Sequence, residues 1–425
     1  MLKRSRYAGL GYVLLAGAIL AGGAYTTWRT YNSSTDFDTY YFAAKRILDG
    51  VFLYQEVSGL SPYIYPPFFA CILSPLALIG LGPAAFLWYL FNIALIWFSL
   101  SAMSLLVFGD PDFIKALGRF RFFPKAVALG VSAAIFLDNL SILQVNILTF
   151  AVALAGIYLI RLKRPFAASA AFAFSISVKV IPAVFFLYFL VKRQFKIAAS
   201  IALFTIVFSV LVPAASLGPG AAPGAFRWWI AENFGKSTGK PNFQMMDNMF
   251  NPKNQSVTAA LSRWMVKNDG NVLYWKKISH EYPEYIHNIT LGLDASVVVG
   301  AAKALSAAIV ILTLVAVALP KKRAGPEQEI YEYSLVFLAS LLTTPILKSQ
   351  HFSFVIFPVM TALWLTEKAG RFPGRFMSRS LAIFLTLYAA VTIPLTGIMG
   401  AGALAVVFLW AAFLLAYIRS SPVLT

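Results

Sequence analysis

The chain has 425 residues, of which 59% are hydrophobic and 12% charged, whereas a soluble globular domain carries about 25% charged residues. This composition excludes an ordinary soluble enzyme, and apolar runs of about 20 residues recur along the chain, as expected of membrane-spanning helices. The net charge of +18 could suit nucleic acid, but the basic residues lie in short loops between apolar runs, which indicates membrane lipids rather than nucleic acid as partners.

The first apolar run, residues 8–27, follows Lys3, Arg4 and Arg6, which predict a cytoplasmic N-terminus. The run could be a cleaved signal peptide, but no convincing small-residue cleavage site follows it, so we favour an uncleaved first span. That span would deliver residues 28–64, a loop rich in Asp and Glu, to the outer face of the membrane.

An amphipathic helix is predicted directly after this span. Ser34 or Thr35 can cap it and Gly50 can end it. Its apolar face, at helical spacing, consists of Phe37, Tyr40, Tyr41, Ala44, Ile47 and Leu48. We expect the helix to lie on the outer leaflet. Asp36 and Asp38 either cap it or act in catalysis, because acids near a membrane surface are costly to bury without a function.

The segment after this helix contains Tyr63 and Tyr65, which predict an aromatic belt ahead of a proline-started helix. Anchoring is the simpler interpretation of both tyrosines, and ligand contact is the alternative. Two apolar runs follow, split near residues 80–83, while the basic residues at 115–125 favour a cytoplasmic loop. Reaching that loop from outside requires an odd number of crossings, so either the first run is re-entrant or the loop breaks the charge rule.

Basic clusters divide the rest of the chain, and if each is cytoplasmic, an even number of crossings separates neighbouring clusters. The hairpins and single spans predicted in this way are 165–191, 197–214, 296–319, 329–366 and 380–418. A large outer loop, 215–295, connects the two single spans. We therefore predict an all-α polytopic membrane protein with about 10 to 12 transmembrane helices in a single domain, residues 1–425.

Polar residues gather at the outer tips of this topology. Gln144 and Asn146 lie at one tip, where bonding to neighbouring helices is the simpler interpretation. Lys179 precedes the helix-breaking Pro182, and a cation inside an apolar hairpin is costly unless it snorkels or meets an anion. His351, at a third tip, suits proton transfer, phosphate binding or a structural role. The charge pattern thus brings several candidate site residues to one face.

Several kinds of site have no support in the sequence. The single Cys71 lies in an apolar run and excludes a disulfide or cysteine-based metal site. His280 and His287 lack a third ligand at suitable spacing, so we expect no zinc site. Nucleotide-binding loops and serine-hydrolase motifs are missing, and internal repeats typical of ion-coupled transporters are not evident. No feature demands a metal or another cofactor.

The order of motifs resembles glycosyltransferase family 87. Asp36-Phe37-x-x-Tyr40-Tyr41-x-Ala43-Ala44 is similar to the family's opening, followed by Gly50, Tyr54, Tyr63-x-Tyr65-Pro66-Pro67 and Pro75-Leu76. Gln144-Val145-Asn146 is similar to its Gly-Gln-Val-Asn segment, with Leu143 where glycine is usual. The later matches are Lys179-x-x-Pro182, Asn254-Gln255-Ser256 with Arg263, and Pro345 ahead of His351. These matches run in order over residues 36–358.

The resemblance implies a membrane glycosyltransferase of GT-C type. Such enzymes transfer one sugar, most often mannose, from a polyprenyl-phosphate donor to a glycolipid or glycan acceptor with inversion, on the outer face of the cell membrane. Asp36 would be the general base, and cations would stabilise the leaving phosphate. The substrate-binding candidates are Asp38, Tyr63, Tyr65, Gln144, Asn146, Lys179, Asn254 and His351. Arg227 and Lys253 are weaker candidates for the phosphate.

Two alternatives remain open at the level of the sequence. A lipid or polysaccharide flippase would also place polar residues at the membrane boundary, but it would need them through the membrane thickness. A related GT-C enzyme, such as an arabinofuranosyltransferase, would share the fold and differ in its sugar.

Overall fold

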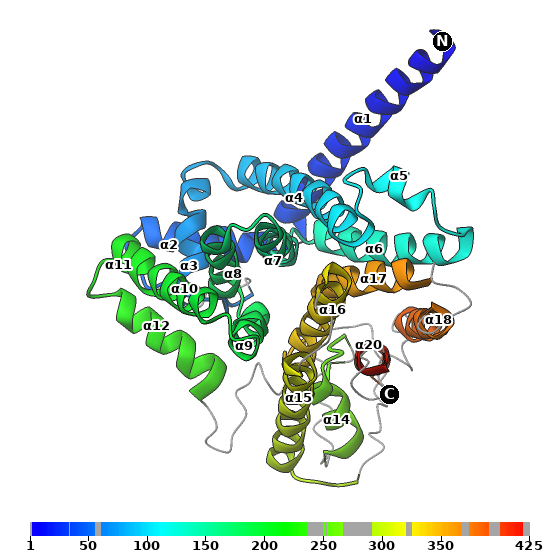
Figure 1. The fold of residues 1–425 in the computed structure, drawn as a ribbon. Coiled ribbons are helices and arrows are strands. Elements are labelled where there is room, and N and C mark those ends of the chain that lie inside the picture. Colours follow the sequence, from blue (N-terminus) through cyan, green and yellow to red (C-terminus); the bar gives the residue numbers. More distant parts are fainter. Residues whose placement is uncertain are drawn as a thin grey trace.

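The computed structural model describes residues 2–33, 35–55, 61–235, 250–251, 253–266, 291–319, 325–366, 374–390 and 400–419. Helices and short turns account for the architecture, and no β-strand occurs within these ranges (Figure 1). The all-α prediction is confirmed. His280 and His287 lie outside the described residues, as do Lys321, Lys322, Arg323 and Arg371 of the basic clusters.

Within the described residues, four helical segments are long and apolar enough to cross a membrane. They are α4 (Leu81–Met103) with its π-helical end Ser104–Phe108, the run from α10 (Phe195–Ile206) through a π-helical turn (Val207–Leu211) to α11 (Val212–Leu217), α15 (Ala295–Ala318) and α20 (Ala401–Arg419). The protein is therefore an α-helical membrane protein. The predicted total of crossings stays a prediction.

The first predicted span lies within one continuous helix, α1 (Leu2–Asn32), which projects from the rest of the molecule (Figure 1). Two glycines let α1 approach α4 closely. A Cβ atom at Gly23 would lie 2.5 Å from the Phe86 ring, and one at Gly22 would lie 2.4 Å from the Tyr89 hydroxyl. Small residues serve the same purpose where membrane helices cross.

The predicted amphipathic helix forms as α2 (Asp36–Leu48), but its apolar face packs against protein. Five of its six predicted apolar residues are buried, whereas Leu48 is 44% exposed. The covering elements are α3 (Pro67–Leu73), the 3₁₀ turn Ser74–Leu78 and α4. The face is therefore not the lipid-facing surface that we expected, because the segment after it folds back and covers it.

The length of the covering segment bears on the two alternatives for residues 65–125. Its helix and 3₁₀ turn span residues 67–78, about 20 Å of chain, which is short of the roughly 30 Å hydrocarbon core. The next helix, α4, is long enough to cross. These lengths favour the re-entrant alternative for the first apolar run.

The middle of the chain forms α5 (Phe113–Leu117), α6 (Phe122–Ser141), α7 (Asn146–Arg161), α8 (Pro165–Val178) and α9 (Val184–Val191). The hairpin of α8 and α9 breaks at Lys179 and a 3₁₀ turn, Ile181–Ala183, as the proline predicts. Within the loop that follows α11, the described helices are α12 (Ala222–Ile230), a π-helical end (Ala231–Gly235) and α14 (Val257–Met265).

The last part of the chain contains the two remaining predicted hairpins. The first consists of α16 (Pro326–Leu342), the 3₁₀ helix η7 (Ser349–Val355) and α17 (Ile356–Thr366). The second pairs α18 (Gly374–Ala390) with α20, and these two helices pack together. Residues 343–348 form the break between α16 and η7.

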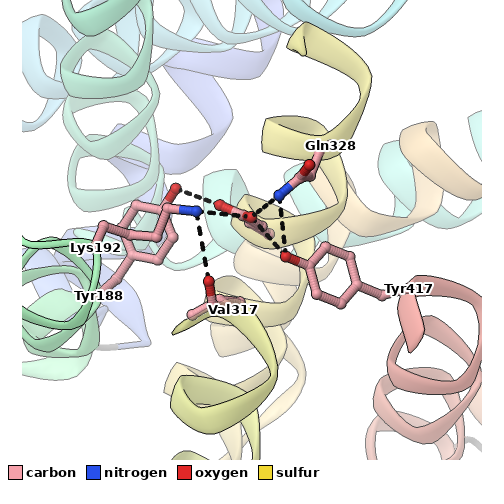
Figure 2. A network of polar contacts seen from close by, with 6 residues as sticks. Tyr188, Lys192, Val317, Gln328 and Tyr417 are labelled. Atoms are coloured by element: carbon pink, nitrogen blue, oxygen red, sulfur yellow. Dashed lines mark hydrogen bonds and ion pairs between the residues drawn. The ribbon is translucent and has the colours of Figure 1, made fainter. Parts of the chain in front are cut away.

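A buried carboxylate ties α9, α16 and α20 together. Glu332 of α16 is 1% exposed and pairs with Lys192 at an Nζ–Oε1 distance of 3.0 Å. It also accepts hydrogen bonds from Tyr188, Gln328 and Tyr417 at 2.6–2.7 Å (Figure 2). A buried charge with this many donors is fully compensated, so the Glu332 cluster stabilises the packing of three helices.

Candidate active site

Asp36 begins α2 and meets the tip between α6 and α7. Its backbone N–H donates to the Ile142 carbonyl oxygen at 3.0 Å, which holds the first turn of α2 against that tip. The side-chain amide of Gln144 donates to the Asp36 carboxylate. Asp36 is half-buried, and burial raises the pKa of its carboxyl, while the positive charges of Lys348 and Lys179 oppose that rise.

Gln144 has a fixed orientation. Its Oε1 atom accepts from the Val145 backbone N–H at 2.8 Å, from the Tyr65 hydroxyl at 3.1 Å and from the Tyr40 hydroxyl. With its oxygen facing these donors, the amide nitrogen faces Asp36. The first two polar tips of the sequence analysis are thus in direct contact.

Leu143 supplies the sharp turn that places Gln144. Its φ is +55°, in the left-handed region that favours glycine, and it is completely buried. The Trp88 indole N–H donates to the Leu143 carbonyl oxygen at 2.9 Å. The tip therefore keeps the backbone shape that a glycine would give, although a leucine occupies the position.

Asn146 and Lys179 connect the tip between α6 and α7 with the turn between α8 and α9. The Lys179 ammonium donates to Asn146 Oδ1 at 2.7 Å and lies 5.5 Å from the centre of the Tyr65 ring. In the turn between α8 and α9, burial lowers the pKa of Lys179 to about 7, and the charge of Asp36 opposes this. An anion bound beside this lysine would favour its charged form.

The tip before η7 completes a polar cluster, which consists of Asp36, Gln144, Asn146, Lys179, Lys348 and His351. The Asn146 amide donates to the Gln350 carbonyl oxygen at 3.1 Å, and Asn139 donates to the same atom at 2.9 Å. The His351 Nδ1 atom accepts from the Lys348 backbone N–H at 3.1 Å. Burial, with Lys179 and Lys348 nearby, lowers the pKa of His351 well below its ordinary value. His351 is therefore a neutral ring with Nε2–H as its donor, rather than a second cation.

Asn254 lies behind this tip. It is completely buried, donates to the Pro345 carbonyl oxygen at 3.1 Å and accepts from the Leu347 N–H at 2.9 Å. The neighbouring Ser256 hydroxyl also donates to Pro345. These contacts hold the 345–348 backbone in place, so they support a positioning role for Asn254.

The remaining candidates differ in how they meet the site. Asp38 is 3% exposed and accepts from the Thr35 backbone N–H at 3.0 Å, the helix-capping role that the spacing allowed. Tyr63 is also buried and donates to the Pro66 carbonyl oxygen at 3.0 Å. Tyr65 is half-buried and contacts both Gln144 and Lys179, so it is the tyrosine that faces the polar cluster.

Sequence reasoning missed Lys348 and Tyr40 as site residues. Lys348 is half-buried, and its charge acts on both Asp36 and His351. A lysine at a predicted outer tip runs against the positive-inside trend, and that signal could have found it. Tyr40 was assigned only to the apolar face of its helix, because periodicity cannot show where a buried hydroxyl points.

An apolar cavity of about 230 Å³ is lined by residues that neighbour Lys179 and Tyr65 in the sequence. Its walls include Ile176, Ser177 and Val180, which flank Lys179, and Pro66, which follows Tyr65. Trp229 closes another side and donates its indole N–H to the Ile64 carbonyl oxygen at 3.1 Å. An apolar space whose walls flank Lys179 in the chain suits an amphiphile with an anionic head.

The arrangement combines the half-buried Asp36 carboxylate, the charges of Lys179 and Lys348, and the side-chain amides of Gln144 and Asn146. A carboxylate with a raised pKa can accept a proton from a hydroxyl, and nearby ammonium groups can stabilise negative charge on a leaving group. The described residues thus supply the parts of a group-transfer site.

Comparison with known proteins agrees with this chemistry. The model of glycosyltransferase family 87 matches residues 63–345. A polyprenol-phosphate-mannose-dependent alpha-(1-2)-phosphatidylinositol mannoside mannosyltransferase of Mycobacterium tuberculosis (strain ATCC 25618 / H37Rv) is 28% identical over 218 residues, which cover 47% of this chain and 50% of that protein. The chain therefore spans about half the length of this relative. No solved structure matches.

The family match includes Gln144, Asn146, Lys179 and Asn254, while Asp36 and His351 flank it on either side. Because the match extends over more than half of the chain, this chain belongs to glycosyltransferase family 87.

Proposed function

We propose that the protein transfers one sugar, mannose, from a polyprenyl-phosphate donor to a hydroxyl of a glycolipid or glycan on the outer face of the cell membrane. The observation that carries the proposal is the position of the Asp36 carboxylate, which receives the Gln144 amide and lies within electrostatic reach of Lys179 and Lys348. The name of the mycobacterial relative supports the choice of donor and sugar.

In the proposed reaction, Asp36 takes the proton of the acceptor hydroxyl. The acceptor oxygen attacks the anomeric carbon on the face opposite the phosphate, and the bond between that carbon and the phosphate oxygen breaks. The electron pair of the broken bond stays on the phosphate, so the reaction inverts the anomeric configuration. Negative charge grows on the phosphate as the bond breaks, and Lys179 and Lys348 would stabilise it.

The lipid part of the donor accounts for the neighbouring apolar cavity. The walls formed by Ile176 and Val180 lie one to three residues from Lys179, so an anionic head at the lysine would leave its tail beside the cavity. Burial of the Lys179 ammonium without an anion lowers its pKa, and a bound phosphate would offset that cost. A water-soluble nucleotide sugar would not use this apolar space.

Purified protein in lipid nanodiscs tests the proposal. Incubation with radiolabelled polyprenyl-phosphate mannose and a membrane lipid extract should yield labelled glycolipid, and the Asp36→Asn variant should yield almost none. If label were transferred only from polyprenyl-phosphate arabinofuranose, the transferred sugar would be arabinofuranose and not mannose. Movement of intact donor across the bilayer without any product would instead support the flippase alternative.

A further inference from the structure

The general base proposed above is connected to a buried tyrosine that lies behind it. Tyr40 is 1% exposed, and its ring packs edge-on against Tyr65 and Phe69 at centroid distances of 5.2 and 5.0 Å. Its hydroxyl donates to Gln144 Oε1 and lies 3.1 Å from the Tyr65 hydroxyl. Such a buried side chain cannot touch an acceptor or a donor, so any effect on catalysis has to pass through its neighbours.

The donors around Gln144 allow one orientation of its amide. The Val145 backbone N–H can only donate, and it points at Gln144 Oε1. A rotation of the amide by 180° would set its NH₂ group against that N–H and would turn its oxygen toward the Asp36 carboxylate. Both contacts would be repulsive, so the NH₂ group stays on Asp36.

Tyr40 strengthens this arrangement. Each proton donated to Oε1 draws electron density from the amide and makes its N–H a stronger donor. The two tyrosine hydroxyls and the Val145 N–H surround the oxygen, and the Gln144 N–H in turn binds one oxygen of Asp36. The chain of contacts ends on the carboxylate, and it favours the ionised form that can accept a proton.

We propose that Tyr40 is a positioning residue that acts through Gln144 to orient the Asp36 carboxylate and keep it ionised. The proposal rests on the assignment of Asp36 as the general base, and it adds a residue that is buried away from both substrates. Other groups that act on Asp36 are Lys179 in the α8–α9 turn, Lys348 before η7, Asp38 on the same helix and Asp138 on α6. None of them changes in the variants below.

The test uses Tyr40→Phe, which removes one hydroxyl and keeps the ring. Tyr41→Phe is the matched control, because Tyr41 is also buried on α2 and donates to the Ile79 carbonyl oxygen at 2.8 Å, away from Gln144. Dicyclohexylcarbodiimide modifies protonated carboxyl groups in membranes, and mass spectrometry can follow its addition to Asp36 as a function of pH. This readout needs no turnover.

In Tyr40→Phe, loss of the hydrogen bond from Tyr40 to Gln144 should raise the labelling midpoint of Asp36 by roughly half a pH unit. It should also lower the transfer rate by roughly 2- to 10-fold at neutral pH. Tyr41→Phe should change neither. In a Gln144→Met background, Tyr40→Phe should have no further effect on the labelling midpoint, because the connection is already broken.

An unchanged labelling midpoint in Tyr40→Phe, or an equal shift in Tyr41→Phe, would overturn the inference. If the wild-type protein transferred no sugar while Tyr40→Phe still moved the midpoint, the proposed function would fail and the connection from Tyr40 to Asp36 would stand. If the wild type transferred sugar and the midpoint did not move in Tyr40→Phe, the proposed function would stand and the connection from Tyr40 to Asp36 would fail.

Discussion

Glu332 and Asp36 are both carboxylates within a helical bundle, and their surroundings differ. Glu332 is 1% exposed and meets one lysine, one glutamine and two tyrosines (Figure 2). Asp36 is half-buried and, among the residues that the structure describes, its carboxylate oxygens receive one hydrogen bond, from Gln144. The first carboxylate is saturated with donors, whereas the second keeps acceptor capacity.

The lysines near the two carboxylates differ in the same way. Lys192 pairs directly with Glu332, while Lys179 donates to the neutral amide of Asn146 and leaves Asp36 without a direct ion pair in the described part of the chain. A closed ion pair stabilises helix packing. A carboxylate and a lysine held apart by amides can each take part in binding and proton transfer. The comparison thus separates a structural site from the proposed active site by how completely each charge is satisfied.

The largest predicted effect concerns the saturated site. Glu332→Ala leaves Lys192 without its carboxylate partner, and removal of one partner of a buried ion pair typically costs about 3–5 kcal/mol. We expect a marked fall in the thermal unfolding temperature of the purified protein, measured by intrinsic fluorescence. An unfolding temperature equal to that of the wild type would show that Glu332 is not a structural site.

Lys179→Gln should act on ligand binding instead of stability. The loss of a charged hydrogen bond to phosphate typically costs about 1.5–3 kcal/mol, or roughly 10- to 150-fold in donor affinity. Equilibrium binding of radiolabelled polyprenyl-phosphate sugar measures this. Lys192→Gln is the control, because its partner is Glu332, and it should leave donor affinity unchanged in the protein that remains folded. Unchanged donor affinity in Lys179→Gln would show that this lysine does not bind the donor and only snorkels to the membrane surface.

His351→Ala should also act on substrate binding and transfer. His351 is neutral and accepts from the Lys348 backbone N–H, so its removal should loosen the tip that holds Lys348 and slow transfer. If His351 and Lys179 contact one phosphate, the double variant should lose less than the product of the two single losses. Strictly multiplicative losses in the transfer rate would place the two residues at separate steps.

A pH dependence follows from the raised pKa of Asp36. A base with a raised pKa is protonated at a higher pH than usual, so the transfer rate should fall as the pH drops through that value. Lys348→Gln removes a positive charge that opposes the rise, and the acidic limb of the pH–rate profile should therefore move to higher pH. An acidic limb that stays in place would show that Lys348 does not act on the base.

The smallest predicted effect concerns the turn at Leu143. Glycine usually destabilises a protein relative to alanine, but at a φ of +55° it avoids a strain of about 1–2 kcal/mol that any residue with a Cβ atom carries. Leu143→Ala and Leu143→Gly both empty a buried position, so the strain is the main difference between them. Leu143→Gly should therefore unfold at the higher temperature of the two, and the opposite order would contradict this account of the turn.

Much of the site could be predicted from the sequence. Hydrophobic runs and basic clusters placed Asp36, Gln144, Asn146, Lys179 and His351 at tips of one face, and hydrogen bonds now connect most of these tips. The proline after Lys179 also predicted the break between α8 and α9. These features depend on local sequence and on the membrane, so short patterns are sufficient to find them.

The remaining features depend on contacts between distant residues. Periodicity identified the apolar face of α2, but it could not show that α3 and α4 cover that face in place of lipid. The partners of Glu332 include Tyr188 and Tyr417, which lie 144 and 85 residues away in the chain. The direction of the Tyr40 hydroxyl likewise depends on Gln144, from another tip. No pattern within one helix carries this information.

A comparison of Asp36→Asn with Asp38→Asn in the sugar-transfer assay tests whether Asp36 is the general base. The two carboxylates lie two residues apart on α2, but Asp36 meets Gln144 while Asp38 caps its own helix. Loss of a general base typically lowers turnover by roughly 10²-fold or more. We predict this loss for Asp36→Asn, at an unchanged unfolding temperature, and a much smaller change in turnover for Asp38→Asn. Near-normal turnover in Asp36→Asn together with inactive Asp38→Asn would contradict the account.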